Sequence, residues 1–267
     1  MRAYLSYFKL RFITCLQYRT AALAAIATQV FFGFVYIMVY MAFYESGGGK
    51  LPMELPQLIT YIWLMQSLLS LVSMFYKDEE IFNLVRTGNI AYELARPKNV
   101  YFMWYFKIIG DRLAKVLLRF APFLIFLLIL PEPYKISLPA SLPHFFLFLT
   151  TLTAGTLLMT TIITLYPIIT MHTLSEKGIV GIIIAMAEIL SGIVVPIPFF
   201  PKFLQIISKC LPFQYVSDLP FRIYVGNIEI SKGIEGLLIQ IIWIIIIGTL
   251  GYFLMQKSLK KVIVQGG

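Results

Sequence analysis

The chain has 267 residues, of which 59% are apolar and only 13% are charged, and its formal net charge is +9. A soluble domain usually carries about 25% charged residues and 45–50% apolar ones, so this composition excludes a soluble enzyme and predicts an all-α integral membrane protein. The positive charge does not predict nucleic-acid binding, because the charges lie at the ends of apolar segments, where they set topology.

The first expected element is an amphipathic helix at residues 2–19. With about 100° of rotation per residue, one of its faces collects Tyr4, Leu5, Phe8, Phe12, Cys15 and Leu16. We expect this helix to lie in the cytoplasmic interface of the membrane. The alternative is a simple N-terminal extension of the first span. Charged residues are scattered through the segment, so it does not resemble a cleavable signal peptide.

The membrane-crossing elements follow. A spanning helix needs about 20 apolar residues to cross a hydrocarbon core of about 30 Å. Six segments satisfy this requirement, at about 20–44, 55–76, 113–130, 145–172, 179–195 and 236–256. We therefore expect residues 1–267 to form a single transmembrane domain. Of the 22 Lys and Arg residues, 16 fall on one side of these spans, and the positive-inside rule makes that side, with both termini, cytoplasmic.

The loop between the second and third spans, residues 77–101, is longer than a connector requires. Three acidic residues at 78–80 are expected to cap or solvate a helix start rather than to perform acid–base chemistry. A turn signal at 87–89 separates this helix from a second short one, which Pro97 ends. We interpret the loop as a cytoplasmic contact surface. The alternative is a solvated connector.

The segment between the fifth and sixth spans, residues 196–232, is expected on the outer side. Pro196, Pro198 and Pro201 break any helix that enters it. The apolar run at 203–211 is too short to span the membrane and too apolar for a free loop. We expect it to dip back into the outer leaflet, where irregular backbone must be shielded by protein or line a water-filled cavity.

The sequence contains no Gly-x-x-x-x-Gly-Lys-Ser/Thr motif, so the phosphate cradle of an ATPase is missing. The glycine run at 47–50 lies in an expected outer loop and lacks a following helix. His144 and His172 are expected at opposite membrane faces, so they cannot share a catalytic site. Cys15 and Cys210 indicate neither a disulfide framework nor a metal site. We expect no catalytic residue, no metal site and no cofactor bound by this chain.

Glu188 is the one acidic residue well inside a predicted span, about 15 Å past Gly178 at 1.5 Å per residue. A carboxylate there costs roughly 2.5–3.5 kcal/mol on insertion scales, so it should face the bundle interior. Two interpretations stay open. One is a residue of a transport pathway, and the other is a structural hydrogen-bond partner for Gln29, Gln66, Ser191 or Thr160. The candidate pathway residues are Gln29, Gln66, Ser70, Thr160, Glu188 and Ser191.

Taken in order, these features resemble the membrane subunit of type-2 ABC exporters. They resemble in particular a bacterial branch of six-span permeases linked to the export of drugs, antibiotics or other small molecules. The branch-like motifs are Tyr18 to Gln29, at the start of the first span, and Ile81 to Pro97, in the cytoplasmic loop, of which Arg86 to Pro97 is the most distinctive part. Broader class features are the break from Ser191 to Pro201 and the segment Pro212-Phe-Gln-Tyr215. The resemblance covers essentially the whole chain.

The resemblance implies that the loop after the second span is a coupling helix, which fits a groove of a cytoplasmic ABC ATPase. The contact residues would be Arg86, Thr87, Gly88, Asn89, Ile90, Tyr92, Glu93, Leu94 and Arg96. The N-terminal helix and the turn at 174–178 would touch the same ATPase, which would bind ATP and Mg. A second permease subunit, identical or related, would complete the transporter in the lipid membrane, with no nucleic-acid partner. The re-entrant segment would line the outer mouth.

The resulting expectation is a permease in the bacterial or archaeal cytoplasmic (inner) membrane that exports a small amphipathic molecule, such as a drug, antibiotic, peptide or lipid-like compound. Two alternatives would work without an ATPase. A secondary transporter would need ion-coupling carboxylates and usually internal repeats, whereas this chain has one intramembrane acid and no convincing duplication. An intramembrane enzyme would need reactive groups that converge at one depth, and the sequence offers none.

Overall fold

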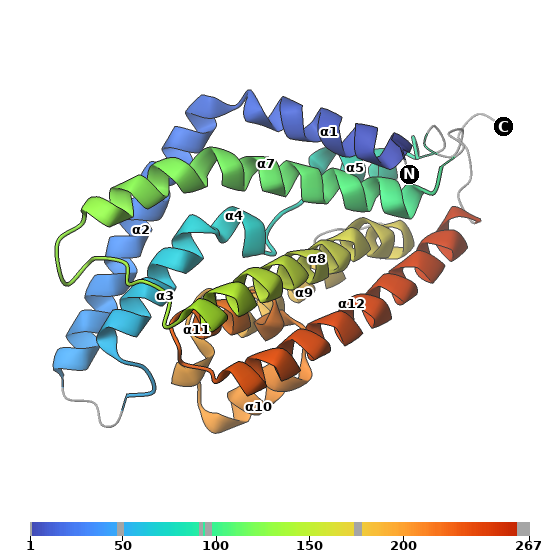
Figure 1. Cartoon of the computed structure of the whole chain (residues 1–267). Helices are drawn as coiled ribbons and strands as arrows, with labels where there is room; N and C mark the ends of the chain where they lie inside the picture. The colour runs from blue at the N-terminus through green and yellow to red at the C-terminus, as the bar shows by residue number, and fades with distance from the viewer. Residues whose placement is uncertain (1, 47–50, 91–92, 94–97, 174–177, 261–267) are drawn as a thin grey trace.

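The computed structural model describes residues 2–46, 51–90, 93, 98–173 and 178–260, and every element in this part of the chain is a helix (Figure 1). Three helices are long and apolar enough to cross a membrane. They are α2 (Arg19–Glu45), α8 (Leu142–Thr173) and α12 (Ile230–Leu259). They contain the first, fourth and sixth predicted spans, and the prediction of an all-helical membrane protein is confirmed.

The N-terminal helix α1 (Arg2–Leu16) lies along the first half of α7 (Val100–Ile129), and Figure 1 shows the two side by side. Tyr4 is on the packed face, where its ring stacks on that of Phe106 with the centroids 5.9 Å apart. Leu5 was predicted on the same face, but its side chain is 54% exposed. Leu5 is rotated about 100° from Tyr4 around the helix axis, so it lies beyond the part of that face that packs on α7. Helix α1 therefore carries apolar side chains on both faces.

The second predicted span, 55–76, is not one continuous helix. It consists of α3 (Leu55–Ser67) and the single turn α4 (Leu69–Val72). The backbone is then non-helical until α5 (Glu79–Arg86) begins. Helical structure ends at Val72, and side chains of α7 and α9 bind the backbone N–H and carbonyl groups of residues 70–75 that then lack a partner within the helix. A hydropathy window cannot detect such partners, and the sequence prediction was wrong at this inner end.

Helix α7 begins at Val100, well before the predicted third span at 113–130. Asn99 caps it, because its side-chain oxygen accepts from the backbone N–H of Tyr101 at 3.0 Å and of Phe102 at 3.4 Å. Charged residues lie four positions apart along α7 and so share one helix face. They are Lys107 and Asp111, which were assigned to a polar loop, and Lys115 and Arg119, which lie inside the predicted third span.

The fifth predicted span, 179–195, is wrong as a continuous helix. Helix α9 (Ile179–Leu190) has 12 residues, about 18 Å of rise, which is too short to cross the hydrocarbon core alone. The outer region that follows is a series of short elements, in agreement with the proline-rich sequence. They are η1 (Ile197–Phe199), α10 (Lys202–Cys210), η2 (Phe213–Tyr215) and α11 (Asp218–Tyr224).

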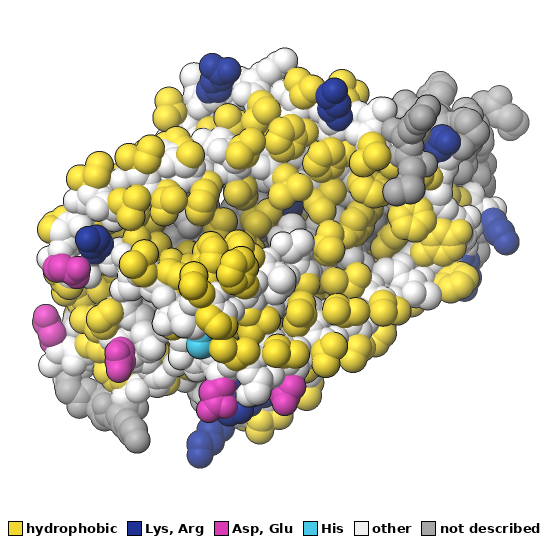
Figure 2. Space-filling model, viewed as in Figure 1, with side chains coloured by type: hydrophobic (Ala, Val, Ile, Leu, Met, Phe, Trp, Pro, Cys, Tyr) yellow, Lys and Arg dark blue, Asp and Glu magenta, His cyan; other side chains and the backbone are white. Residues whose placement is uncertain are grey.

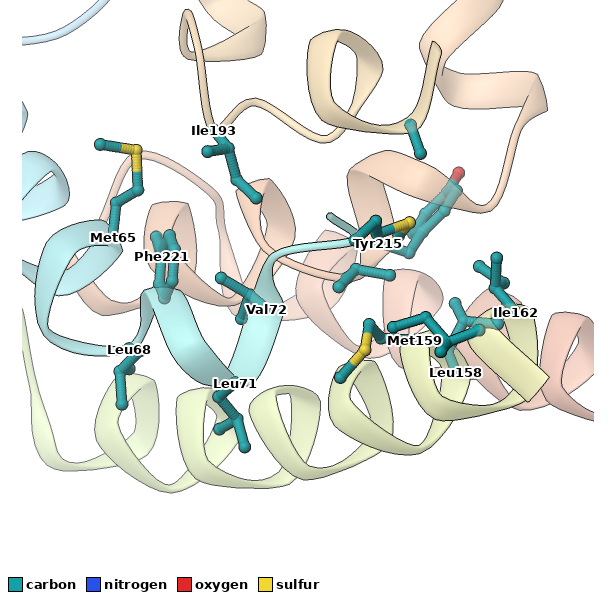
Figure 3. Close-up of a cluster of buried hydrophobic side chains, with 14 of the residues drawn as sticks. Met65, Leu68, Leu71, Val72, Leu158, Met159, Ile162, Ile193, Tyr215 and Phe221 are labelled. Carbon is teal, nitrogen blue, oxygen red and sulfur yellow. The ribbon is translucent and has the colours of Figure 1, made fainter. Parts of the chain in front are cut away.

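The core lies where α4, α8 and the outer region meet (Figure 3). Its buried side chains come from segments that are distant in sequence. They include Met65, Leu68, Leu71 and Val72, then Leu158, Met159 and Ile162, and finally Ile193, Tyr215 and Phe221. Lipid tails are as apolar as these side chains, so close packing, rather than exclusion of water, holds such helices together.

The outer surface of the bundle is largely apolar. Figure 2 shows hydrophobic side chains over most of the face formed by α7, α8 and α12, with Lys, Arg, Asp and Glu near its edges. Many large hydrophobic residues of α2 and α12 are exposed, among them Phe31, Val39, Ile245 and Phe253. A surface of this kind suits contact with lipid or with another membrane subunit.

Candidate functional site

The segment between α4 and α5, together with the side chains that hold it, is called the inner junction here. It comprises residues 73–78. Glu188 of α9 reaches this segment, and one of its carboxylate oxygens accepts three hydrogen bonds. The donors are the Ser73 hydroxyl at 2.9 Å and the backbone N–H groups of Met74 at 2.6 Å and Phe75 at 3.0 Å. The Glu188 carboxylate therefore caps an interrupted backbone, and Glu188 is only 6% exposed.

Two further helices bind this segment and the end of α4. Arg112 of α7 donates from its guanidinium to the carbonyl oxygens of Ser70 at 2.9 Å and Ser73 at 2.7 Å. Tyr166 of α8 donates its hydroxyl to the carbonyl oxygen of Met74 at 3.4 Å. Arg112 is 1% exposed, so backbone carbonyls rather than water accept from its two terminal nitrogens, while its Nε has no hydrogen-bond partner among the described residues.

One peptide group thus lies between two opposite charges. The carbonyl oxygen of the Ser73–Met74 peptide accepts from Arg112, and the N–H of the same peptide donates to Glu188. Hydrogen bonds to ionised groups are shorter and stronger than neutral ones. The peptide dipole points in the favourable direction for both charges. The arrangement connects α7 and α9 through the backbone that leads into α5.

A cluster of four charges fixes the start of α5 and is called the charge cluster here. Asp78 is the N-cap of α5, where its carboxylate accepts from the Ile81 N–H at 3.1 Å, so the expected capping role is confirmed for this residue. The buried ammonium of Lys107 lies 2.9 Å from Asp78 and 3.0 Å from Glu80. Arg11 of α1 forms a further ion pair with Glu80. The cluster joins α1, α5 and α7.

A second set of contacts fastens α1 to α7. The thiol of Cys15 donates to one carboxylate oxygen of Asp111 at 2.7 Å, and Lys115 lies 2.6 Å from the other. Burial, followed by the hydrogen bond to Asp111, raises the pKa of Cys15 to about 12. The side chain is therefore a neutral donor at physiological pH. At the other end of α1, the Tyr4 hydroxyl accepts from the Asn99 N–H at 3.0 Å.

The residues predicted to contact an ATPase lie at the end of α5. Arg86, Thr87 and Asn89 are exposed there. Gly88 has φ of 72°, a left-handed conformation that favours glycine and ends the helix. Among the other predicted contacts, Ile90 and Glu93 are buried, and Tyr92, Leu94 and Arg96 lie outside the described residues. The segment 174–177 also lies outside them.

The structure separates the six candidate pathway residues. Gln29 and Gln66 line one cavity of about 150 Å³ between α2 and α3, and Gln29 Oε1 has no hydrogen-bond partner within the described part of the chain. Thr160 donates to the carbonyl of Thr156 in its own helix. Ser70 and Glu188 belong to the inner junction, and the Ser191 hydroxyl donates to the main-chain oxygen of Glu188.

Within the described residues, the Glu188 carboxylate is bound by Ser73, Met74 and Phe75. It does not hydrogen-bond to the side chains of Gln29, Gln66, Thr160 or Ser191, which were the expected structural partners. The sequence could not reveal the actual partners, because two of the three donors are backbone groups. Arg112 and Lys107 were also missed, since they were assigned to a polar loop.

A second buried carboxylate holds the outer region, and this site is called the outer junction. Asp218 of α11 is 1% exposed. One of its oxygens accepts from the Tyr61 hydroxyl at 3.0 Å and the Ile197 N–H at 3.2 Å, and Arg222 lies 3.4 Å from the other. The sequence reading missed this site. Asp218 could have been found from the sequence, because it is an isolated acidic residue in an apolar stretch, as Glu188 is.

Gly192 completes the outer junction. Its φ is +85°, and its carbonyl oxygen lies 3.0 Å from the Tyr61 hydroxyl, which shares its one proton between this oxygen and the Asp218 carboxylate. A Cβ atom at this position would stand 2.8 Å from the Tyr61 hydroxyl and 2.9 Å from the Asp218 Cβ. Beside the junction lies a cavity of about 480 Å³ between η2, α11 and α12, lined in part by Arg222 and Lys232.

Comparison with known proteins gives one match. A family model described as ABC-2 family transporter protein matches residues 19–266. The matched range contains both junctions, and it begins after α1. No curated protein and no solved structure matches the chain. Among the described residues, no group of three or more His, Cys, Asp or Glu side chains is placed to hold a metal ion.

Proposed function

The chain belongs to the ABC-2 family of transporter proteins, and on this premise we propose that it is the permease subunit of an ATP-driven exporter. It crosses the cytoplasmic membrane of a bacterium or archaeon six times, with both termini in the cytoplasm. The crossings are α2, α3 with α4, α7, α8, α9 with the outer elements, and α12. The positive-inside distribution of Lys and Arg supports this orientation.

The chain itself performs no catalysis in this proposal. A cytoplasmic ABC ATPase binds ATP and Mg and supplies the energy. A second permease subunit, identical or related, lies against this one, and the cargo is a small amphipathic molecule of the drug, antibiotic, peptide or lipid-like kind. The exposed apolar face of α2 supports a subunit contact in the membrane.

The observation that carries the proposal is the Ser73–Met74 peptide held between Arg112 and Glu188. A push on α5 moves this peptide, and the peptide cannot move without α7 and α9, because both charged side chains are buried and bound to it. Breaking either contact would leave a buried charge or a buried backbone group without a partner, which is costly. The force therefore reaches the spans instead of being absorbed by a loop.

The charge cluster supports the same role. Lys107 and Arg11 attach the start of α5 to α7 and α1. The cytoplasmic unit, formed by α1, α5 and the first half of α7, then moves as one body, with the exposed tip of α5, at Arg86 and Asn89, as the contact for the ATPase. The cavity lined by Gln29 and Gln66 is also lined by Leu69 of α4, the turn that precedes the inner junction. We assign it to the transport pathway, where the free amide oxygen of Gln29 is an acceptor for cargo.

The test is co-expression of the chain with the candidate ABC ATPases of the same genome. Arg86→Glu combined with Asn89→Glu changes only exposed residues at the tip of α5. We expect the amount of co-purified ATPase to fall about tenfold, because charge complementarity controls such contacts. The matched control is Lys202→Glu in α10, which is exposed on the outer side. Unchanged co-purification and unchanged cargo-stimulated ATP hydrolysis of the double variant would overturn the coupling role.

A further inference from the structure

Helix α7 carries a stripe of charges that the proposed coupling role does not fully use. Lys107, Asp111, Lys115 and Arg119 are spaced four residues apart, so they lie on one face of the helix. The first three have partners. Lys107 pairs with the acids at the start of α5, and Asp111 pairs with Lys115 while accepting from Cys15. Arg119 is the last residue of the stripe, and its side chain lines a cavity.

Arg119 lines a cavity of about 350 Å³ at the elbow between α1 and α2. Its Nε atom is buried and has no hydrogen-bond partner within the described part of the chain. Ala21 and Ala22 of α2 form another wall of the cavity, and their small side chains leave it open. Tyr18 stands at the elbow and is 65% exposed. Its exposed ring at the start of a span is typical of the membrane–water interface.

The charges around this cavity do not cancel. Arg11 and Lys115 also line it, but Arg11 pairs with Glu80, and Lys115 pairs with Asp111. Both oxygens of Asp111 are engaged, one by Cys15 and one by Lys115. Arg119 therefore adds a positive charge that the paired residues do not neutralise. A guanidinium next to hydrocarbon is costly unless an anion accepts from it.

We propose that the elbow cavity binds the phosphate group of an anionic phospholipid of the cytoplasmic leaflet, of the phosphatidylglycerol type. Arginine and phosphate form charge-assisted hydrogen bonds of good geometry. Basic pockets between helices on the cytoplasmic side are known to suit such headgroups. The outward face of α1 exposes Leu5, Leu10 and Ile13, which offer an apolar surface for the acyl chains. The lipid then fastens α1 to α2 at the elbow and thereby stabilises the cytoplasmic unit.

The experiment uses the purified full-length chain in neutral detergent without an ATPase, so its outcome is independent of the proposed coupling. The thermal unfolding midpoint is measured while short-chain phosphatidylglycerol, short-chain phosphatidylcholine or inorganic phosphate is titrated. We expect a saturable rise with phosphatidylglycerol alone. An equal rise with phosphatidylcholine would overturn recognition of the anionic headgroup. An equal rise with inorganic phosphate would show a site for free phosphate and would overturn the lipid proposal.

Variants locate the site. Arg119→Gln should weaken the apparent affinity for phosphatidylglycerol about tenfold or more, the effect of losing one charge-assisted hydrogen bond, and Arg119→Lys should restore part of it. The matched control is Lys9→Gln, which removes the same charge from the exposed side of α1. Equal weakening by Lys9→Gln would indicate general surface attraction and refute the proposal.

A second variant covers the case in which Arg119→Gln does not fold. Ala21 is exposed and lines the cavity, so Ala21→Phe fills the space from the surface of α2 without altering any charge. We expect it to abolish the saturable response to phosphatidylglycerol. An undiminished response in this variant would mean that the lipid binds elsewhere.

Discussion

The inner and outer junctions both use a buried carboxylate to hold interrupted backbone, but they recruit its partners differently. At the inner junction, Glu188 of α9 and Arg112 of α7 come from two helices and meet through a peptide group of a third segment. At the outer junction, Asp218 and Arg222 are four residues apart on one short helix, and the carboxylate also accepts from Tyr61 of α3.

This difference determines what each junction can do. Charges on separate helices, joined through one peptide, make the relative position of those helices depend on the backbone between them. Charges on a single helix mainly neutralise each other locally, as an i,i+4 pair does. We therefore expect substitutions at the inner junction to change both stability and coupling, and substitutions at the outer junction to change stability alone.

The largest effect is expected for Glu188→Ala. The substitution leaves the backbone N–H groups of Met74 and Phe75 and the Ser73 hydroxyl without their acceptor. Unsatisfied buried groups cost about 1–3 kcal/mol each, so we expect a loss of about 3 kcal/mol or more in the free energy of unfolding. Thermal unfolding in detergent measures it, and cargo-stimulated ATP hydrolysis should be lost as well. Wild-type stability in this variant would rule out the inner junction as described.

Gly192→Ala probes the outer junction with an effect of about 2 kcal/mol. A left-handed conformation costs a residue with a Cβ atom about 1–2 kcal/mol, and the new methyl group would crowd Tyr61 and Asp218. The control is Gly181→Ala in α9, where a Cβ atom would meet nothing within 4 Å. There we expect unchanged or slightly higher stability. Equal destabilisation by both substitutions would contradict the tight packing inferred at Gly192.

A pair of amide substitutions compares the two carboxylates directly. Glu188→Gln and Asp218→Asn keep an oxygen acceptor and remove the charge, so each should cost only about 1 kcal/mol. The expected difference lies in function. Glu188→Gln should reduce cargo-stimulated ATP hydrolysis of the assembled transporter, while Asp218→Asn should leave it unchanged. If Asp218→Asn reduced cargo-stimulated ATP hydrolysis and Glu188→Gln did not, the coupling role would belong to the outer junction.

The smallest intervention is chemical labelling, which changes no contact. Cys15 is held as a thiol with its pKa raised to about 12, so it should react with a maleimide at neutral pH at least about a hundredfold more slowly than an ordinary exposed thiol. Cys210 is exposed on α10. A membrane-impermeant maleimide added to intact cells should label Cys210 alone. Labelling of Cys15 by reagent added outside the cells would contradict the proposed orientation, in which α1 is cytoplasmic.

Much of the fold could be predicted from the chain alone. The uncharged stretches that became α2, α8 and α12 were long enough to identify by length and hydropathy. The prolines between 196 and 201 correctly predicted that no long helix continues into the outer region, although α9 already ends at Leu190. The errors came where charge lies within a helix or where an apolar helix is interrupted. Lys107 and Arg112 suggested a loop, and 73–76 suggested a helix, since hydropathy cannot register a partner from another segment.

The candidate site was predictable in part. Glu188 was identified because a lone acid in an apolar span is costly, and Asp78 was correctly expected to cap a helix. The partners of Glu188 were not predictable. Asp218 carried the same signal as Glu188, but it stood in a segment of uncertain topology and was overlooked. The roles of Gln29 and Gln66 in a pathway, and of Arg86 at an ATPase, stay predictions.

Composition and the order of residues along the chain were enough to predict a helical membrane protein, because the energy of placing apolar and charged residues in lipid depends on them. The helix breaks and the pairing of the buried charges became visible in the folded chain. Hydrogen bonds such as those of Arg112 and Glu188 to the Ser73–Met74 peptide depend on distances between helices. Those distances follow from the packing of all segments together.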